Sequence, residues 1–211
     1  MTPAIRPLTA LLAFALSACV PPDAAPPGSV TQPAAAAPLD WERGHPERAA
    51  WSAALRQTIA ADLPRFGVPA DIGEYCPTFG RLDAARRTEA LAVMSVAIAK
   101  RESAYNPATV FGEPPPLSVD SVGLFQLSYE DGFSWCRLDR ASDSLKDPVN
   151  NITCAVGEMA RLVARDGMIA SGSTTSDARG MSRYWSVVRN GSSHFKAEIQ
   201  GKVQVLPICA G

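Results

Sequence analysis

The chain has 211 residues, which is enough for one domain of ordinary size. Its formal net charge is −1, so the composition offers no basic surface for a nucleic acid and no acidic tail. Apolar residues make up 46% and charged residues 19%, which is typical of a domain with a hydrophobic core.

The first 18 residues have the pattern of a bacterial export signal. Arg6 precedes a short apolar run, LTALLAFAL (residues 8–16), which is too short to span a bilayer and indicates a signal peptide. The next residues, LSAC, resemble the lipobox of bacterial lipoproteins, in which the cysteine, here Cys19, becomes the lipid-modified N-terminus. The alternative is an ordinary signal peptide with a chance cysteine. Val20 is not the aspartate associated with inner-membrane retention, so we expect an outer-membrane lipoprotein facing the periplasm of a Gram-negative bacterium.

Residues 19–45 are predicted to be a Pro/Ala-rich linker behind the lipid anchor. Six prolines among alanines in residues 20–38 cannot build a core, so this segment is expected to be an extended, semi-rigid tether. We place the folded domain at residues 46–211.

Helical spacing of apolar residues begins directly after the linker. In residues 46–63 apolar side chains recur every fourth position from Trp51 to Leu63, which predicts a helix. Pro64 and the FGVPADIG stretch are expected to end it.

A second strong helix is predicted over residues 83–101. One face of it carries Leu91, Ser95, Ile98 and Glu102. Glu102 therefore continues a mostly apolar stripe that should point inward. The residue before Pro107 avoids the helical region, so this helix should end by about Asn106.

The second half of the chain is also predicted to be mainly helical. A proline-rich loop fills residues 107–122, and residues 123–128 (GLFQLS) are expected to open a short helix. A longer helix is predicted over residues 147–165, with Asp147 as its N-cap and Pro148 as its first residue. A last helical stretch is expected over residues 181–189. The sequence has no strong alternating strand pattern, so the fold class is mainly α.

Four cysteines remain if Cys19 is lipidated, and an even number in an exported chain suggests two disulfides. Three connectivities are possible. The simplest pairs Cys136 with Cys154, which lie close in sequence, and Cys76 with Cys209, which bracket the folded region. The sequence has no close Cys-x-x-Cys pair and only two histidines, so we expect no metal and no cofactor.

Three motifs follow one another in the folded region: ESAYNP (residues 102–107), SVGLFQLS (residues 121–128) and DPVNNI (residues 147–152). Their order and spacing resemble the soluble-type (SLT) lytic transglycosylases of glycoside hydrolase family 23. The resemblance covers roughly residues 84–190 and implies a lysozyme-like fold.

Glu102 matches the single acid–base glutamate of that family. A carboxyl at an inward-facing helix end loses water, so its pKa should rise and keep it protonated, ready to donate to a glycosidic oxygen. The alternative is a helix-end glutamate paired with Arg101 or Arg137.

The resemblance suggests further site residues, each with a structural alternative. Ser103 could touch the substrate or bond a helix-end carbonyl. Gly123 would let a glycan approach the backbone, and Gln126 could bond sugar amides. Asn151 could touch the substrate or cap a helix. Tyr184, in a stretch RYWSV that departs from the family's Ala-Tyr-Asn-x-Gly, is the candidate to orient Glu102 or else a core aromatic.

No second carboxylate is distinguished by a motif. The candidates stand in loops or at helix caps: Glu113, Asp120, Glu130, Asp131 and Asp147. The family manages without one, because the sugar's N-acetyl group stabilises positive charge and its C6 hydroxyl attacks C1 to give a 1,6-anhydro product.

The resemblance therefore implies a peptidoglycan lytic transglycosylase that cleaves the β-1,4 bond between MurNAc and GlcNAc. The alternatives are a lysozyme-like muramidase and a non-catalytic peptidoglycan-binding lipoprotein. Glycan strands and the outer-membrane lipid are the expected partners, and the sequence identifies no protein partner.

Overall fold

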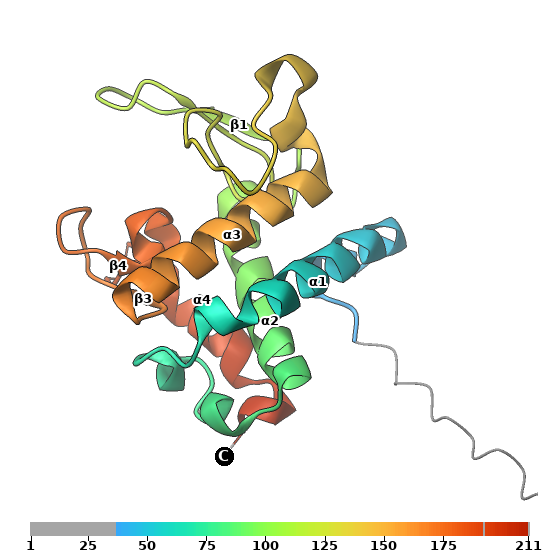
Figure 1. Cartoon of the computed structure of the whole chain (residues 1–211), viewed down its shortest axis with the longest axis vertical. Helices are drawn as coiled ribbons and strands as arrows, with labels where there is room; N and C mark the ends of the chain where they lie inside the picture. Colours follow the sequence, from blue (N-terminus) through green and yellow to red (C-terminus); the bar gives the residue numbers. More distant parts are fainter. Residues whose placement is uncertain (1–36, 192, 211) are drawn as a thin grey trace, which may run out of the picture. The chain divides into compact units, whose positions relative to one another are not determined.

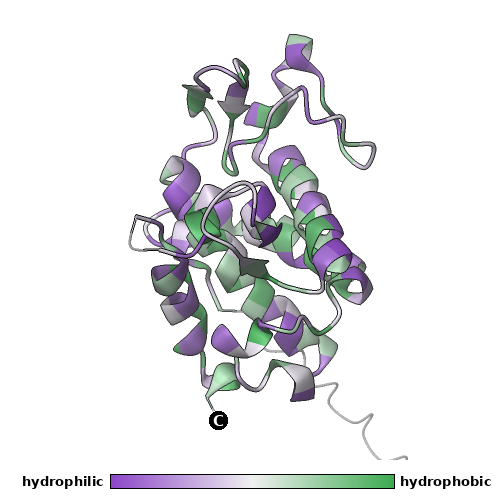
Figure 2. Ribbon diagram, turned by 90° about the vertical axis from the view of Figure 1, so that its left-hand side faces the viewer, coloured by the Kyte–Doolittle hydropathy of each residue, from purple (hydrophilic) through white to green (hydrophobic). Residues whose placement is uncertain are grey.

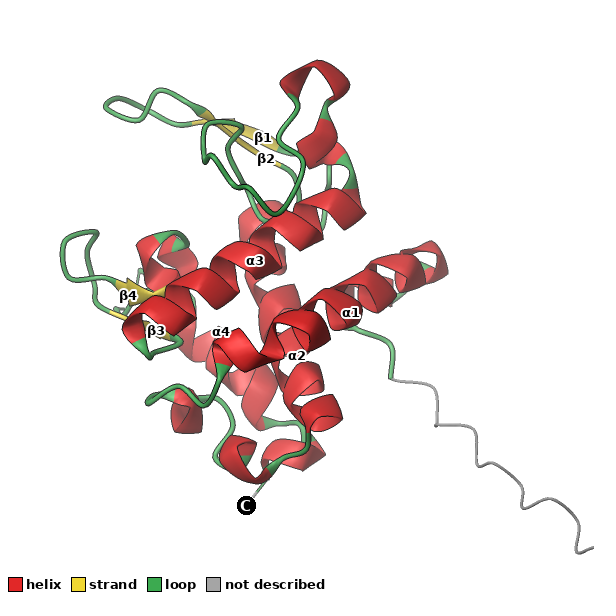
Figure 3. Cartoon of the chain, in the orientation of Figure 1, coloured by secondary structure: helices red, strands yellow, loops and turns green. Residues whose placement is uncertain are grey.

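A computed structural model describes residues 37–191 and 193–210 of the chain. This part is mainly helical (Figures 1 and 3), as predicted. The signal peptide, Cys19 and nearly all of the predicted tether lie outside the described residues. The α-helices of the described part are α1 (Ala49–Phe66), α2 (Ala84–Ser103), α3 (Pro148–Asp166) and α4 (Lys196–Gln204). Its strands form two antiparallel hairpins, β1 (Val110–Gly112) with β2 (Asp120–Val122) and β3 (Ala170–Ser171) with β4 (Arg179–Gly180).

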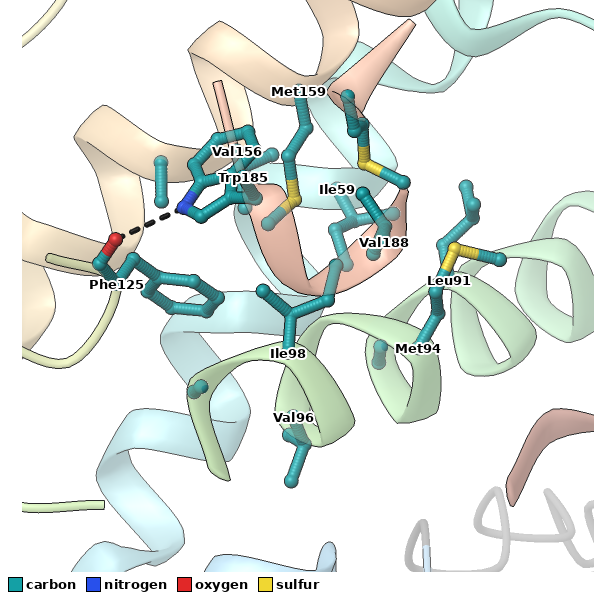
Figure 4. Close-up of a cluster of buried hydrophobic side chains, with 14 of the residues drawn as sticks. Ile59, Leu91, Met94, Val96, Ile98, Phe125, Val156, Met159, Trp185 and Val188 are labelled. Atoms are coloured by element: carbon teal, nitrogen blue, oxygen red, sulfur yellow. Dashed lines mark hydrogen bonds between the residues drawn. The ribbon is translucent and has the colours of Figure 1, made fainter. Parts of the chain in front are cut away.

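The core lies where three long helices meet. Helix α1 packs against both α2 and α3, while α4 packs on α2 (Figure 1). The helices carry hydrophobic and hydrophilic residues in alternating patches (Figure 2). Figure 4 shows the buried cluster, in which Trp185 lies among side chains of α2 and α3. The indole Nε1 of Trp185 donates to the Phe125 carbonyl over 2.9 Å, so burial of this ring leaves no polar group unpaired.

The predicted inward stripe of α2 is confirmed. Leu91, Ser95 and Ile98 are buried, and the hydroxyl of Ser95 is satisfied by the Leu91 carbonyl one turn earlier. The helix ends at Ser103 because Ala104 adopts a left-handed conformation, with φ of 51°. The N-cap of α3 is also as predicted, since Asp147 accepts a hydrogen bond from the Asn150 amide and Pro148 is the first helical residue.

Pro64 does not end α1, contrary to prediction. The helix continues to Phe66 although a proline cannot donate to the preceding turn. Phe66 is buried in the core, and Gly67 caps the helix by donating to the Leu63 carbonyl. The hydrophobic contact of the last turn therefore offsets the missing hydrogen bond.

Two segments expected to be helical have other structures. Residues 123–128 form a tight turn, closed by hydrogen bonds in both directions between the backbones of Val122 and Leu127 (2.8 and 3.0 Å). Residues 181–189 contain two short 3-10 turns, separated by Trp185 in an extended conformation, because its ring is buried in the core.

Helix α4 and the four strands of the described residues are not predicted by the sequence pattern. The strands have two or three residues each, which is too short for an alternating pattern to show. Helix α4 buries only Ile199 and Val203 and contains Gly201, so its helical signal is weak.

The folded domain begins before residue 46, where the sequence analysis had placed its start. Leu39 and Trp41 are buried, and the Trp41 ring packs edge-on against Trp51 and Tyr105. Its Nε1 donates to Ser52 over 2.7 Å. The last residues assigned to the linker are therefore part of the core.

The predicted cysteine pairing is confirmed. One disulfide joins Cys76 to Cys209 across 133 positions, and the other joins Cys136 to Cys154 across 18 positions. The first attaches the C-terminal end to the segment before α2, and the second attaches the loop before α3 to that helix. Within residues 37–191 and 193–210, no helix is both long and apolar enough to cross a membrane.

Candidate active site

A cavity of about 610 Å³ lies at the C-terminal end of α2. Its walls come from that helix end, the β1–β2 hairpin, the turn over residues 123–128 and the segment around Trp185. Residues that are distant in sequence therefore meet around Glu102, the penultimate residue of α2.

Glu102 has no hydrogen-bond or ion-pair partner among the residues that the structure describes. The two cations that could have paired with it are engaged elsewhere: Arg101 forms an ion pair with Glu198 of α4, and Arg137 pairs with Asp139 over 2.7 Å. The guanidinium of Arg101 also lies over the Phe195 ring. The alternative reading of Glu102 as a paired helix-end charge is therefore wrong.

The electrostatic environment of Glu102 favours its protonated form. Burial, and secondly the negative charge of Glu113, raise the pKa of Glu102 from 4.5 to about 7. A carboxyl with this pKa holds a proton in about half of the molecules at neutral pH, so it can either donate or accept one.

Glu113 supplies a second carboxylate in the same cavity. It directly follows β1, its backbone amide donates to the Val119 carbonyl, and its side chain accepts from the Ser121 hydroxyl over 2.8 Å. The hairpin thus fixes Glu113 in the cavity that Glu102 also lines. The sequence analysis had included Glu113 among several loop carboxylates without distinguishing it, because the fold of the proline-rich loop was not visible in its sequence.

Tyr184 also lines the cavity, but its hydroxyl has a different partner from the one expected. It donates to Asp131 over 2.6 Å, and the same hydroxyl accepts from the Ser128 amide over 3.3 Å. Burial and the Asp131 charge raise the pKa of Tyr184, so the phenol stays protonated. The hydrogen bond predicted between Tyr184 and Glu102 is not formed, and the phenol positions Asp131 instead.

Asp131 is the third carboxyl group of the cavity. Burial raises its pKa, although hydrogen bonds from Tyr184 and from the Ser128 amide act in the opposite direction. Both hydrogen bonds reach the same oxygen, Oδ2, and Oδ1 has no partner among the described residues. That oxygen is available to a donor in the cavity.

The turn over residues 123–128 is built around Asn151, which is fully buried. Its amide nitrogen donates to the carbonyls of Val122 and Leu145, and its oxygen accepts from the Phe125 amide. Gly123 lies against it with φ of 83°, and a Cβ there would come within 2.3 Å of the Asn151 nitrogen. Gly123 thus permits close approach of Asn151, rather than of a glycan, and Asn151 neither caps a helix nor faces the cavity.

Of the two remaining candidates, Gln126 faces the cavity and Ser103 is buried. Gln126 lines the cavity; its Nε2 donates to the Gly123 and Thr109 carbonyls, while its Oε1 has no partner among the described residues. Since both carbonyls require a donor, the amide orientation is fixed and its oxygen remains to accept a hydrogen bond. Ser103 is buried and donates to the carbonyls of Ala99 and Leu124, so it joins α2 to the turn.

Residues 82–180 match the family described as "Transglycosylase SLT domain". A solved structure titled "Bd0314 DslA wild-type form 2" is 30% identical, with a TM-score of 0.70, and the match covers 82% of this chain and 98% of that one. The chain belongs to the SLT-domain family. Two further structures of DslA, each with a glutamate replaced by glutamine, match at 29% and 28% identity with the same TM-score and coverage of 82% and 97%. No curated protein matches the sequence.

The rim of the cavity in this SLT domain is apolar. Val110, Phe111 and Leu117 belong to the β1–β2 hairpin, line the cavity and are about half exposed or more. Such exposure is costly unless something else covers these side chains. The SLT domain therefore combines an apolar rim with an acidic interior.

The described part of the SLT domain contains no group of three or more His, Cys, Asp or Glu side chains arranged to hold a metal ion.

Proposed function

We propose that this protein cleaves the glycan strands of peptidoglycan as a lytic transglycosylase, at the β-1,4 bond between N-acetylmuramic acid and N-acetylglucosamine. The observation that carries the proposal is Glu102: a half-buried carboxyl with a pKa of about 7 and no partner among the described residues, in a cavity of an SLT domain. A single group of this kind can act first as acid and then as base.

In the first step, protonated Glu102 donates to the glycosidic oxygen, and the bond to C1 of the muramic acid breaks. Positive charge at C1 is stabilised by the sugar's own N-acetyl group. In the second step, the Glu102 carboxylate removes the proton of the C6 hydroxyl as its oxygen attacks C1. The product is a 1,6-anhydro sugar, no water is consumed, and Glu102 regains its proton.

Other groups of the cavity hold the glycan for this reaction. The free Oε1 of Gln126 accepts a hydrogen bond from an N–H or hydroxyl group of a sugar. Phe111 and Leu117 cover the apolar faces of the sugar rings, which explains their exposure in the free protein. Tyr184 and Asp131, joined by a hydrogen bond, act as a unit in the same cavity.

Digestion of purified sacculi followed by mass spectrometry tests this reaction. The expected fragments end in anhydro-muramic acid and are lighter by one water than the products of hydrolysis. Fragments that carry a reducing end would contradict the transglycosylase reaction. A protein that binds sacculi but releases nothing would contradict enzymatic activity altogether.

A muramidase of the same fold is the second candidate, and Glu113 is the observation that favours it. Glycosidases that use water ordinarily have two carboxyl groups beside the bond, and Glu113 lies in the cavity with Glu102. The glutamates replaced in the two DslA variants, at positions 143 and 154 of that chain, lie eleven residues apart, as do Glu102 and Glu113. This equal spacing supports a role for both side chains.

Replacement of Glu113 by glutamine distinguishes the two candidates. Activity requires a proton on Glu102 and is lost as pH rises through its pKa of about 7. The charge of Glu113 contributes to raising that pKa, so in Glu113→Gln the alkaline limb of the pH profile of kcat/KM should move to lower pH. The maximal rate of a transglycosylase should stay near that of the parent.

A muramidase that uses Glu113 to activate water would instead lose roughly a hundredfold or more in rate at every pH. Glu130→Gln is the matched control, because Glu130 is an exposed glutamate that pairs with Arg140 outside the cavity. An unchanged alkaline limb in Glu113→Gln would show that Glu113 does not act on Glu102.

We also propose that the protein is an outer-membrane lipoprotein that faces the periplasm, with lipid on Cys19. Two disulfides in the folded domain support an oxidising compartment. Cys19→Ser should lose the lipid and its membrane affinity together and move to the soluble fraction. A Cys19→Ser protein that still carries lipid and sediments with membranes would overturn the assignment.

A further inference from the structure

Of the two arginines that line the cavity, only Arg183 forms an ion pair with a described residue. Arg183 forms an ion pair with Asp166, with 2.5 Å between Nε and Oδ2. Arg189 has no ion pair with any residue that the structure describes; its Nε donates to the Ser182 carbonyl over 3.0 Å, and no other partner of its guanidinium is found there. Arg189 therefore brings an uncompensated positive charge to the wall of the cavity.

Three carboxyl groups of the described residues, Asp166, Glu158 and Asp131, form no pair with Arg189. Asp166 is engaged by Arg183, and the buried Glu158 pairs with Arg161 over 2.5 Å. Asp131 is held by Tyr184 and the Ser128 amide. A half-buried guanidinium with terminal N–H groups left over is a receptor for an anion, and its planar fork fits a carboxylate.

We propose that Arg189 is a carboxylate-binding subsite of the cavity, which takes a carboxylate on the muramic acid branch of the glycan. This inference rests on the proposed function, because peptidoglycan supplies the ligand. Where a peptide is attached, the lactyl carboxyl is its amide link and the carboxylate is one of the peptide's own; on muramic acid without a peptide, the carboxylate is that of the lactyl group. The charge of Glu113 repels it, while Arg189 attracts it, so the charge distribution favours one direction of the strand.

The test is the KM for cleavage of intact sacculi. Loss of a charge-assisted hydrogen bond in Arg189→Gln should raise KM by about ten- to a hundredfold, with kcat near the parent value. Arg189→Lys keeps the charge but loses the Nε bond to Ser182, and it should remain much closer to the parent. Arg179→Gln is the matched control: Arg179 is exposed, lies outside the cavity and should keep the parent KM.

Glycan strands freed of peptides by an amidase distinguish the two sources of the carboxylate. A defect of Arg189→Gln that is present on intact sacculi and disappears on these strands assigns the peptide carboxylate. A defect that appears only on these strands assigns the lactyl carboxylate that the amidase has freed, and a defect on both substrates shows that Arg189 takes either carboxylate. A parent KM on both substrates would overturn the subsite. Equal losses in the Gln and Lys variants, together with a lower melting temperature, would also overturn it and assign Arg189 to the fold.

Co-sedimentation of parent and variants with sacculi separates this inference from the proposed function. If the parent releases no fragments, the proposed reaction fails, while the subsite is still judged by binding. Arg189→Gln should then bind sacculi about ten- to a hundredfold more weakly than the parent, and equal binding would overturn the subsite.

Discussion

Glu102→Gln is expected to reduce the release of fragments from purified sacculi by several orders of magnitude. Glutamine keeps the shape of the side chain but cannot deliver a proton. One proton-transfer role is worth roughly 10²–10⁴-fold in rate, and Glu102 is proposed to fill both the acid and the base role. The loss should therefore exceed that range, measured as the initial rate of muropeptide release.

The same substitution should make the protein more stable at neutral and alkaline pH. The pKa of Glu102 is raised from 4.5 to about 7 in the folded state, so the folded protein binds more protons than the unfolded chain between these values. Its stability therefore falls as pH rises through this window and stays lowered above it. Because glutamine does not titrate, the variant should gain about 1–3 kcal/mol at pH 8, and the gain should vanish below pH 4.5.

Denaturant unfolding at pH 4 and pH 8 measures this difference, and Glu47→Gln is the control. Glu47 is an exposed carboxylate outside the cavity, so its replacement should leave both activity and the neutral-pH stability near the parent values. A well-folded Glu102→Gln protein that still releases anhydro-muropeptides at the parent rate would refute the mechanism. Loss of stability at pH 8 would instead mean that the carboxylate is favourably paired.

The parts of the fold that the sequence predicts are those with long, regular patterns. Helix α2 shows a full apolar stripe ending in Glu102, and α3 shows both its N-cap, Asp147, and its first-turn proline. The apolar stripe also predicts the inward position of Glu102, whereas its proposed acid–base role comes from the resemblance of ESAYNP to the SLT family. A carboxyl that continues an apolar stripe must be buried, whatever the rest of the fold.

The remainder of the site depends on contacts between distant segments. Glu113 reaches the cavity through a hairpin of three-residue strands, and Tyr184 meets Asp131 across 53 positions. The residue pattern within one segment does not show which distant segment it will contact. The motifs also do not show that Gly123 packs against Asn151, or that Asn151 accepts a hydrogen bond from the Phe125 amide.

Removal of the Cys76–Cys209 disulfide is the largest expected change in stability. The bond closes a loop of 133 positions, and the chain-entropy argument assigns such a loop about 4–5 kcal/mol. In a domain of this size, the loss should lower the melting temperature of Cys76→Ser/Cys209→Ser by about 10–20 °C. Thermal unfolding followed by circular dichroism measures it. A double variant that melts with the parent would contradict the prediction.

Below the melting transition, we expect the two disulfides to rank in the opposite order for their effects on activity and on stability. Both Cys76 and Cys209 lie outside the cavity, so the first double variant should keep the parent rate while folded.

Cys136→Ser/Cys154→Ser opens a loop of only 18 positions and should lose about 3 kcal/mol. The Cys136 segment, however, also carries Asp131, and its Phe133 and Trp135 rings stack 4.9 Å apart beside Tyr184. Freeing that segment loosens one wall of the cavity. The disulfide that contributes less to stability should therefore contribute more to catalysis, and equal rates in the two folded variants would show that this wall is held by its side chains alone.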